Sequence, residues 1–228
     1  MKKTVRKIRE MSFFRMQKAE RREMGRKVIF ACLGIFLIGI GVSWNAAAGL
    51  GNDPVGIFYD GIRAALNLEP EQLGAASNIV NLALAVLLLL VGRRYLSIGT
   101  LIYILPYGVC VSLGSWIYAQ LFAGDGLVGQ IAASVAGCTL LYIGVAIFVT
   151  VDIGLDPMTG VAMVIRDRLH WDFKRAKWLF DGTLTLVGFL LGGTLGVVTL
   201  LTALLAGPSI QFISGKLTGI RNRFSDGK

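Results

Sequence analysis

The 228-residue sequence is poor in the side chains on which most enzyme chemistry depends. It contains one histidine, three cysteines and 16% charged residues, whereas an average soluble domain has about 25% charged residues. The histidine, His170, lies outside any H-E-x-x-H pattern, and there is no G-x-S-x-G or phosphate-binding loop. The cysteines are odd in number and lack C-x-x-C spacing. We therefore expect no disulfide, no metal site, no cofactor and no enzymatic activity.

Long apolar runs take up most of the chain instead. Hydrophobic residues account for 54% of the sequence, and the mean hydropathy is +0.66. A helix needs about 20 apolar residues to cross the hydrocarbon core of a bilayer. The sequence predicts an all-α membrane protein with about six transmembrane helices, and these lie over residues 28–48, 73–91, 98–121, 127–149, 176–193 and 195–213.

The distribution of basic residues predicts how the chain is oriented. Residues 1–27 carry a net charge of +8, out of +9 for the whole chain. This tail is typical of a cytosolic retention signal; binding to anionic membrane lipids is an alternative, and nucleic-acid binding is not expected. Basic residues also follow the second and fourth apolar runs and fill the tail 216–228, whereas the opposite loops carry only Arg63. By the positive-inside rule, we expect both termini in the cytoplasm.

An internal repeat divides the membrane part of the chain into two copies. When residues 34–66 are compared with residues 137–169, 11 of 33 positions are identical, whereas composition alone would give about three. The copies span residues 28–121 and 127–215, and each holds three predicted spans. Because three is odd, the second copy would enter the membrane from the opposite side. Two such inverted three-helix repeats are typical of secondary transporters and of some channels.

Two short segments with glycine and Asp-Pro occur at corresponding places in the two copies, GLGNDP (49–54) and GLDP (154–157). Two further short segments are GTL (99–101) and AGP (206–208). In these segments and in size, the chain resembles the YczE/YitT group of bacterial integral membrane proteins over residues 28–215. The resemblance implies a bacterial plasma membrane but no substrate. Many members have Pro-Trp-Asp or Pro-Arg-Asp after the glycines, whereas this chain has Asp-Pro, so a role for an aspartate after the proline does not carry over.

The two Asp-Pro segments are the first candidates for a binding site. Asp53 and Asp156 are suited to N-cap helices that begin with proline. Each helix, ending near Leu66 or Leu169, would be about 20 Å long and too short to span the membrane. It is either an amphipathic helix lying in the interface or a re-entrant helix whose N-terminus points at a shared central site.

The first of these short helices has an apolar stripe with polar side chains opposite to it. The expected stripe consists of Val55, Phe58, Ile62, Ala65 and Leu66, and the opposite face carries Tyr59, Asp60 and Arg63.

Polar residues within the apolar runs complete the candidate site. Asp181 is the only acid well inside a run, and such acids are often functional, although Lys177 one turn away offers a simple ion pair. Asn78 corresponds to Asp181 in the sequence repeat. For Asn81 we expect a role in packing between helices. The candidate substrate-binding residues are Asp53, Asp156, Asn78, Asp181, Arg63 and Arg166.

The sequence as a whole predicts an inverted-repeat transporter or permease for a small polar solute or ion. The alternative is a substrate-binding or accessory subunit of a larger membrane complex. Its expected partners are membrane lipids, the solute, and either a second copy of the chain or another membrane protein. The repeat is the observation that favours transport, because two oppositely oriented halves can form states that open to opposite sides.

Overall fold

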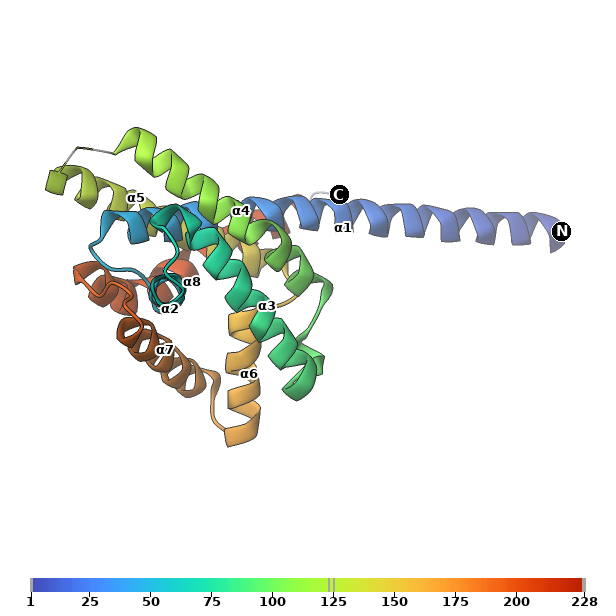
Figure 1. Ribbon diagram of the computed structural model, residues 1–228. Helices are drawn as coiled ribbons and strands as arrows, with labels where there is room; N and C mark the ends of the chain where they lie inside the picture. The colour runs from blue at the N-terminus through green and yellow to red at the C-terminus, as the bar shows by residue number, and fades with distance from the viewer. Residues whose placement is uncertain (1, 123, 125, 227–228) are drawn as a thin grey trace.

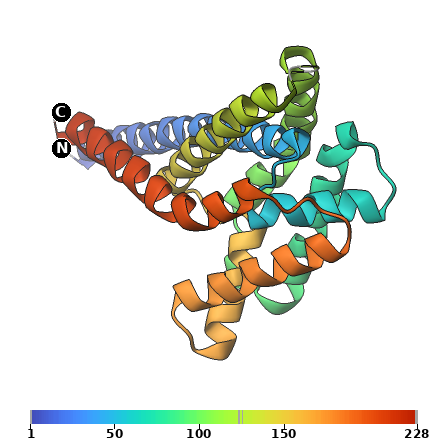
Figure 2. The ribbon, with the colours of Figure 1, turned by 90° about the vertical axis from the view of Figure 1, so that its left-hand side faces the viewer.

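The computed structural model describes residues 2–122, 124 and 126–226, and the side chains of residues 21–219 within those ranges. This part of the chain is helical and contains no β-strand. Figures 1 and 2 show the arrangement of the helices, with the N-terminal end of α1 and the C-terminal end of α8 projecting toward the same side. The elements are α1 (Lys2–Ala48), α2 (Pro54–Ala65), η1 (Pro70–Gln72), α3 (Leu73–Val91), η2 (Arg93–Tyr95), α4 (Ile98–Leu121), α5 (Gly126–Val151), α6 (Pro157–Leu169), α7 (Phe173–Leu190) and α8 (Val197–Asp226).

Five helical segments in the described part of the chain are long and apolar enough to cross a membrane. They are Arg21–Ala48, Pro70–Val91, Ile98–Leu121, Gly126–Val151 and Val197–Gly219. The remaining predicted span lies in α7, which has 18 residues and carries four charged side chains. The predicted boundaries at residues 27 and 216 are not breaks in the helices, because α1 and α8 continue through them.

The most extensive helix packing joins α1 to α5, and glycines lie at its contacts. A Cβ at Gly41 would lie 2.5 Å from the Gly137 carbonyl oxygen, and a Cβ at Gly144 would lie 2.6 Å from the Gly34 carbonyl oxygen. Only glycine allows the two backbones to approach this closely. In the sequence repeat, Gly34 corresponds to Gly137 and Gly41 corresponds to Gly144. The second contact is therefore the first contact with each glycine replaced by its repeat equivalent.

The loops before α2 and α6 each pack against the helix start of the other copy. The Gly99 amide donates to the Ile153 carbonyl at 3.2 Å, and the Val198 amide donates to the Leu50 carbonyl at 3.0 Å. In the same loops, Gly51 has a φ of +103° and its equivalent Gly154 has a φ of +139°. Only glycine adopts such angles without strain, which explains why both copies retain it.

The two short helices pack on the third helix of the opposite copy. α2 lies against α7, and α6 lies against α3, as the two views agree. At the first contact a Cβ on Gly61 would lie 2.3 Å from the Gly188 carbonyl oxygen, so the backbones touch. α2 and α6 thereby connect the two halves of the chain.

Both faces of α2 take part in packing. Tyr59 and Asp60 of the polar face are buried, and Val55, Phe58 and Ile62 of the apolar stripe pack against the core. Leu66 lies just beyond the helix and is 49% exposed. In a bilayer the outward direction is apolar, so polar side chains are placed inside the protein.

Candidate functional site

The two Asp-Pro segments form capped helix N-termini, and this prediction is confirmed. The Asp53 carboxylate accepts hydrogen bonds from the Val55 and Gly56 amides, each at 3.3 Å. The Asp156 carboxylate accepts one from the Thr159 amide at 3.0 Å. In both helices proline occupies the start, where no amide hydrogen is needed.

The loop before α2 folds back along α1. The Asn52 side chain donates to the Val42 carbonyl at 2.9 Å, and its own carbonyl accepts from the Asp53 amide at 2.9 Å. Val42 lies six residues before the end of α1, which corresponds to about 9 Å along the helix. Asp53 therefore lies beside α1, below its end.

The starts of α2 and α6 are linked through the start of α4. The Leu155 carbonyl, next to Asp156, accepts a hydrogen bond from the Thr100 hydroxyl at 2.7 Å, one turn before Tyr103 on α4. Asp53 begins the helix that carries Tyr59. Asp181 lies on α7, which packs against both α2 and α6, so three of the six predicted site residues lie on elements that pack together.

Buried tyrosines form the wall of this region. The ring centroids of Tyr59 and Tyr107 are 5.7 Å apart, and those of Tyr103 and Tyr107 are 4.9 Å apart in a stacked arrangement. Tyr107 lies near the middle of the 24-residue α4. The Tyr59 hydroxyl donates to the Asn81 side-chain carbonyl at 3.0 Å. We define the central polar cluster as Asp53, Asp156, Asp181, Lys177, Tyr59, Tyr103, Tyr107 and Asn81.

Two hydrogen-bond donors in the central polar cluster lack a partner among the described residues. They are the Asn81 amide nitrogen and the Tyr107 hydroxyl, and both side chains are fully buried. Buried polar groups are satisfied in the great majority of cases, because an unpaired one costs about 1–3 kcal/mol. These two donors are therefore available to a polar ligand that enters the cluster.

The charges of the central polar cluster do not cancel. Lys177 forms an ion pair with Asp181 one turn further along α7, as expected from the sequence. Asp53 and Asp156 remain without an ion-pair partner among the described residues, so the cluster has an excess of carboxylates. No three acidic, histidine or cysteine side chains of the described residues lie close enough together to hold a metal ion.

The other three predicted residues lie outside the central polar cluster. Asn78 accepts a hydrogen bond from the Gly108 amide at 3.0 Å, next to Pro106 where α4 lacks a backbone donor. Arg63 donates to Asp60 at 2.8 Å and to the Leu68 carbonyl at 2.8 Å. These contacts hold helices and loops together.

Arg63 and Arg166 instead occupy corresponding contacts at two ends of the molecule. Arg63 pairs with Asp60, whose other oxygen accepts from the Thr194 amide and hydroxyl at 3.2 and 3.3 Å. We call these three residues the Asp60 latch.

The second arginine forms a similar group. Arg166 pairs with Asp167 at 2.8 Å, and Asp167 also accepts hydrogen bonds from Tyr95 and Arg94. We call these four residues the Asp167 latch. Tyr95 and Thr194 lie directly before α4 and α8, so each latch fastens a short helix to the helix start of the other copy.

Sequence reasoning missed Tyr59, Tyr103 and Tyr107 as site residues. Tyr103 and Tyr107 lie four residues apart in an apolar run, and that spacing places two polar hydroxyls on one face of a membrane helix. This signal was available before the structure. Tyr59 was placed opposite the apolar stripe of α2 but was not selected as a site residue.

Comparison with known proteins decides the family. Residues 25–215 match the family model described as "Family of unknown function (DUF6198)". The chain belongs to the DUF6198 family. The matched region of this DUF6198 protein begins within α1 and ends within α8, so it includes the central polar cluster and both latches.

Three relatives are similar to this DUF6198 protein over most of their length. An uncharacterized protein of Haemophilus influenzae is 27% identical over 176 residues, which cover 77% of this chain and 78% of the relative. The uncharacterized membrane protein YczE of Bacillus subtilis is 24% identical over 193 residues, covering 84% and 87%. The uncharacterized protein YyaS of the same organism is 20% identical over 181 residues, covering 79% and 89%. No solved structure matches the chain.

These relatives confirm the similarity to YczE that the glycine–proline segments predicted. Together with the apolar helices, they identify the chain as a membrane protein.

Proposed function

We propose that this DUF6198 protein is an inverted-repeat transporter for a small polar solute, with its binding site at the central polar cluster. The observation that carries the proposal is the row of buried tyrosine rings that links the helix begun by Asp53 to the start of α4, where the loop before Asp156 is hydrogen-bonded. These aspartates begin equivalent helices in the two copies of the sequence repeat. Transporters built from inverted repeats bind substrate where discontinuous helices of both halves meet, near the middle of the membrane.

The latches support an alternating-access mechanism. Each joins one copy to the other near the end of a short helix, and each includes an arginine that is equivalent in the repeat, Arg63 or Arg166. If the second copy is inverted, the Asp60 latch and the Asp167 latch lie at opposite faces of the membrane. Release of one while the other stays closed would open the central polar cluster to one side only.

The charge of the central polar cluster favours a solute that carries a positive charge. Asp53, Asp156 and Asp181 outnumber the single Lys177. The tyrosine rings add apolar surface with polar tips, and aromatic rings attract cations. The unpartnered Asn81 amide and Tyr107 hydroxyl can donate to an oxygen of the same solute. A small organic amine with an oxygen acceptor fits this set of groups.

Substitution by serine separates the charge of each aspartate from its capping role. Serine caps helices about as well as aspartate, whereas alanine does not. Asp53→Ser and Asp156→Ser should abolish saturable uptake of small amines into vesicles that contain the purified protein, and leave the melting temperature nearly unchanged. Asp172→Ser is the matched control, because Asp172 caps the exposed start of α7 by accepting from the Arg175 amide.

The outcome also separates this proposal from its alternatives. Uptake by the chain alone supports a transporter rather than an accessory subunit or an enzyme. Uptake that survives both serine substitutions, or falls equally in Asp172→Ser, would contradict the assignment of the site. Binding of amines without uptake would favour a substrate-binding subunit of a larger complex.

A further inference from the structure

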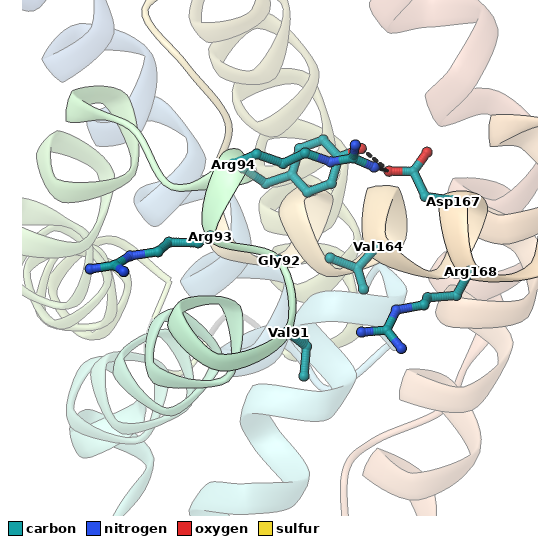
Figure 3. A pocket seen from close by; sticks show the side chains of 8 residues that line it. Val91, Gly92, Arg93, Arg94, Val164, Asp167 and Arg168 are labelled. Carbon is teal, nitrogen blue, oxygen red and sulfur yellow. Dashed lines mark hydrogen bonds and ion pairs between the residues drawn. The ribbon is translucent and has the colours of Figure 1, made fainter.

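A pocket of about 270 Å³ lies beside the Asp167 latch, away from the central polar cluster. It is formed by the end of α3, η2 and the last turns of α6 (Figure 3). Its lining includes three arginines and one carboxylate, so positive charge predominates.

The arginines of this pocket are not equally engaged. Arg94 pairs with Asp167, which is shared with Arg166. Arg168 forms no ion pair with a described residue, and in Figure 3 its side chain extends past Val164 toward Val91. Arg93 points away from the other labelled side chains. Arg94 and Arg168 therefore reach the pocket from two elements, while Arg93 stands at its edge.

The rest of the pocket lining is apolar and tightly packed. Val91 and Val164 contribute aliphatic surface between the charged groups. A Cβ at Gly92 would lie 2.2 Å from a methyl group of Val164, so α3 and α6 meet here without space for a side chain. The pocket thus combines a fixed apolar side with guanidinium groups.

We propose that this pocket binds a phosphate-type oxyanion through Arg94 and Arg168. Guanidinium groups bind such oxygens in bidentate pairs, and Arg94 and Arg168 approach from separate elements that could hold opposite sides of one anion. The phosphate belongs either to the headgroup of an anionic lipid or to a free phosphate compound. Basic pockets between membrane helices are typical headgroup sites, and the adjoining valines suit the lipid source.

Occupation of the pocket has a consequence for the neighbouring latch. The anion and the Asp167 carboxylate compete for the same Arg94 guanidinium. A bound phosphate would therefore loosen the tie between η2 and α6. The inference about binding stands without any transport activity, and its test uses binding alone.

The test measures phosphate binding to the purified full-length protein. Inorganic phosphate is titrated in a thermal-shift assay at constant ionic strength. For the lipid, the melting temperature of the protein is compared between nanodiscs of neutral lipid and nanodiscs of neutral lipid with phosphatidylglycerol. Arg168→Gln should weaken binding at least about tenfold, since it removes one of two charged contacts. Arg93→Gln and Arg175→Gln serve as controls, because Arg93 points away and Arg175 pairs with Asp172 on the exposed start of α7.

The arms of the experiment distinguish the source of the phosphate. Binding of inorganic phosphate that depends on Arg168 supports a soluble compound, and binding only with phosphatidylglycerol supports a lipid headgroup. Equal weakening in all three variants would mean general surface attraction and would overturn the proposal, as would the absence of binding to either probe. Arg94→Gln is measured together with its melting temperature, because it also removes a contact of the Asp167 latch.

Discussion

Asp60 on α2 accepts hydrogen bonds from both the amide and the hydroxyl of Thr194, across the boundary between the two copies of the repeat. Arg63 neutralises the same carboxylate from one turn along α2. Removal of one partner from a buried ion pair is destabilising, because it leaves a buried charge uncompensated. The contact between α2 and the segment before α8 should therefore be sensitive to the loss of a single partner of Asp60.

Weakening one latch should expose the central polar cluster from one side. We expect Thr194→Val to increase labelling of an Asp53→Cys reporter from the outer side, because the Asp60 latch loses a donor. Tyr95→Phe should increase it from the inner side. Labelling is measured with an impermeant maleimide in oriented vesicles, in a protein whose native cysteines are replaced. Thr183→Val, which removes a hydroxyl bonded only to its own helix, is the control. Equal labelling in all variants would refute the latch mechanism.

The orientation of the chain can be tested at two exposed ends. Glu71→Cys should react from outside intact cells, and Asp172→Cys should react only after the cells are opened. Glu71 lies in η1 and Asp172 caps α7; both side chains are exposed, so neither substitution removes a buried contact. This expectation rests on the distribution of basic residues. Reaction of both cysteines from the same side would contradict the inverted arrangement.

Glycine packing between α1 and α5 should be intolerant of one added methyl group. Gly41→Ala places a carbon 2.5 Å from the Gly137 carbonyl oxygen and 2.7 Å from the Leu141 amide nitrogen. Because both neighbours are backbone, we expect a loss of about 1–3 kcal/mol in the free energy of unfolding. Gly182→Ala meets no atom within 4 Å and should be neutral or slightly stabilising. Melting temperatures in one detergent compare the two variants, and equal values would disprove the close contact.

The Asp167 latch should be insensitive to pH near neutrality. Hydrogen bonds from Tyr95, Arg166 and Arg94 hold the pKa of the Asp167 carboxyl at about 2, below its ordinary value of 3.8. A lowered pKa means that the ionised group contributes its full stability above the ordinary value and loses it as the pH falls toward 2.

The corresponding measurement compares wild type with Asp167→Asn. The melting temperature of the variant should be lower by the same amount at about pH 5 and about pH 8, and the difference should shrink below about pH 4. A difference that changes between pH 5 and 8 would show that the carboxylate titrates there, contrary to the lowered pKa.

The sequence predicted where the helices lie better than it predicted which of their faces are buried. The aspartate–proline starts of α2 and α6 were predictable because N-caps are local: the chain within three residues determines them. The buried face of α2 was not, because it depends on α7, which lies more than a hundred residues away. Tyr59 is buried only because α3 and α4 place Asn81 and Tyr107 against it.

The candidate site could likewise be predicted only where it depends on nearby residues in the sequence. Asp53, Asp156 and Asp181 were selected as polar groups at unusual places, and the structure places them at the starts of α2 and α6 and on α7, which packs against both helices. Arg63 and Arg166 were recognised as equivalent, yet their partners Asp60 and Asp167 are not equivalent positions in the repeat. A comparison by spacing alone therefore did not reveal the latches. Asn78 accepts a hydrogen bond from the Gly108 amide of α4, a contact between helices that the sequence pattern does not reveal.

The hydrogen bond between Leu50 and Val198 joins two segments that are synthesised at different times. During synthesis, α1 to α4 emerge from the ribosome before α7 and α8 exist. In that interval the Leu50 carbonyl lacks the Val198 amide, and Gly61 lacks the α7 backbone against which it packs. An unpaired backbone group in lipid costs several kcal/mol. We therefore expect the α2 segment to reach its final position only after the second half is inserted, and the amino-terminal half not to fold separately.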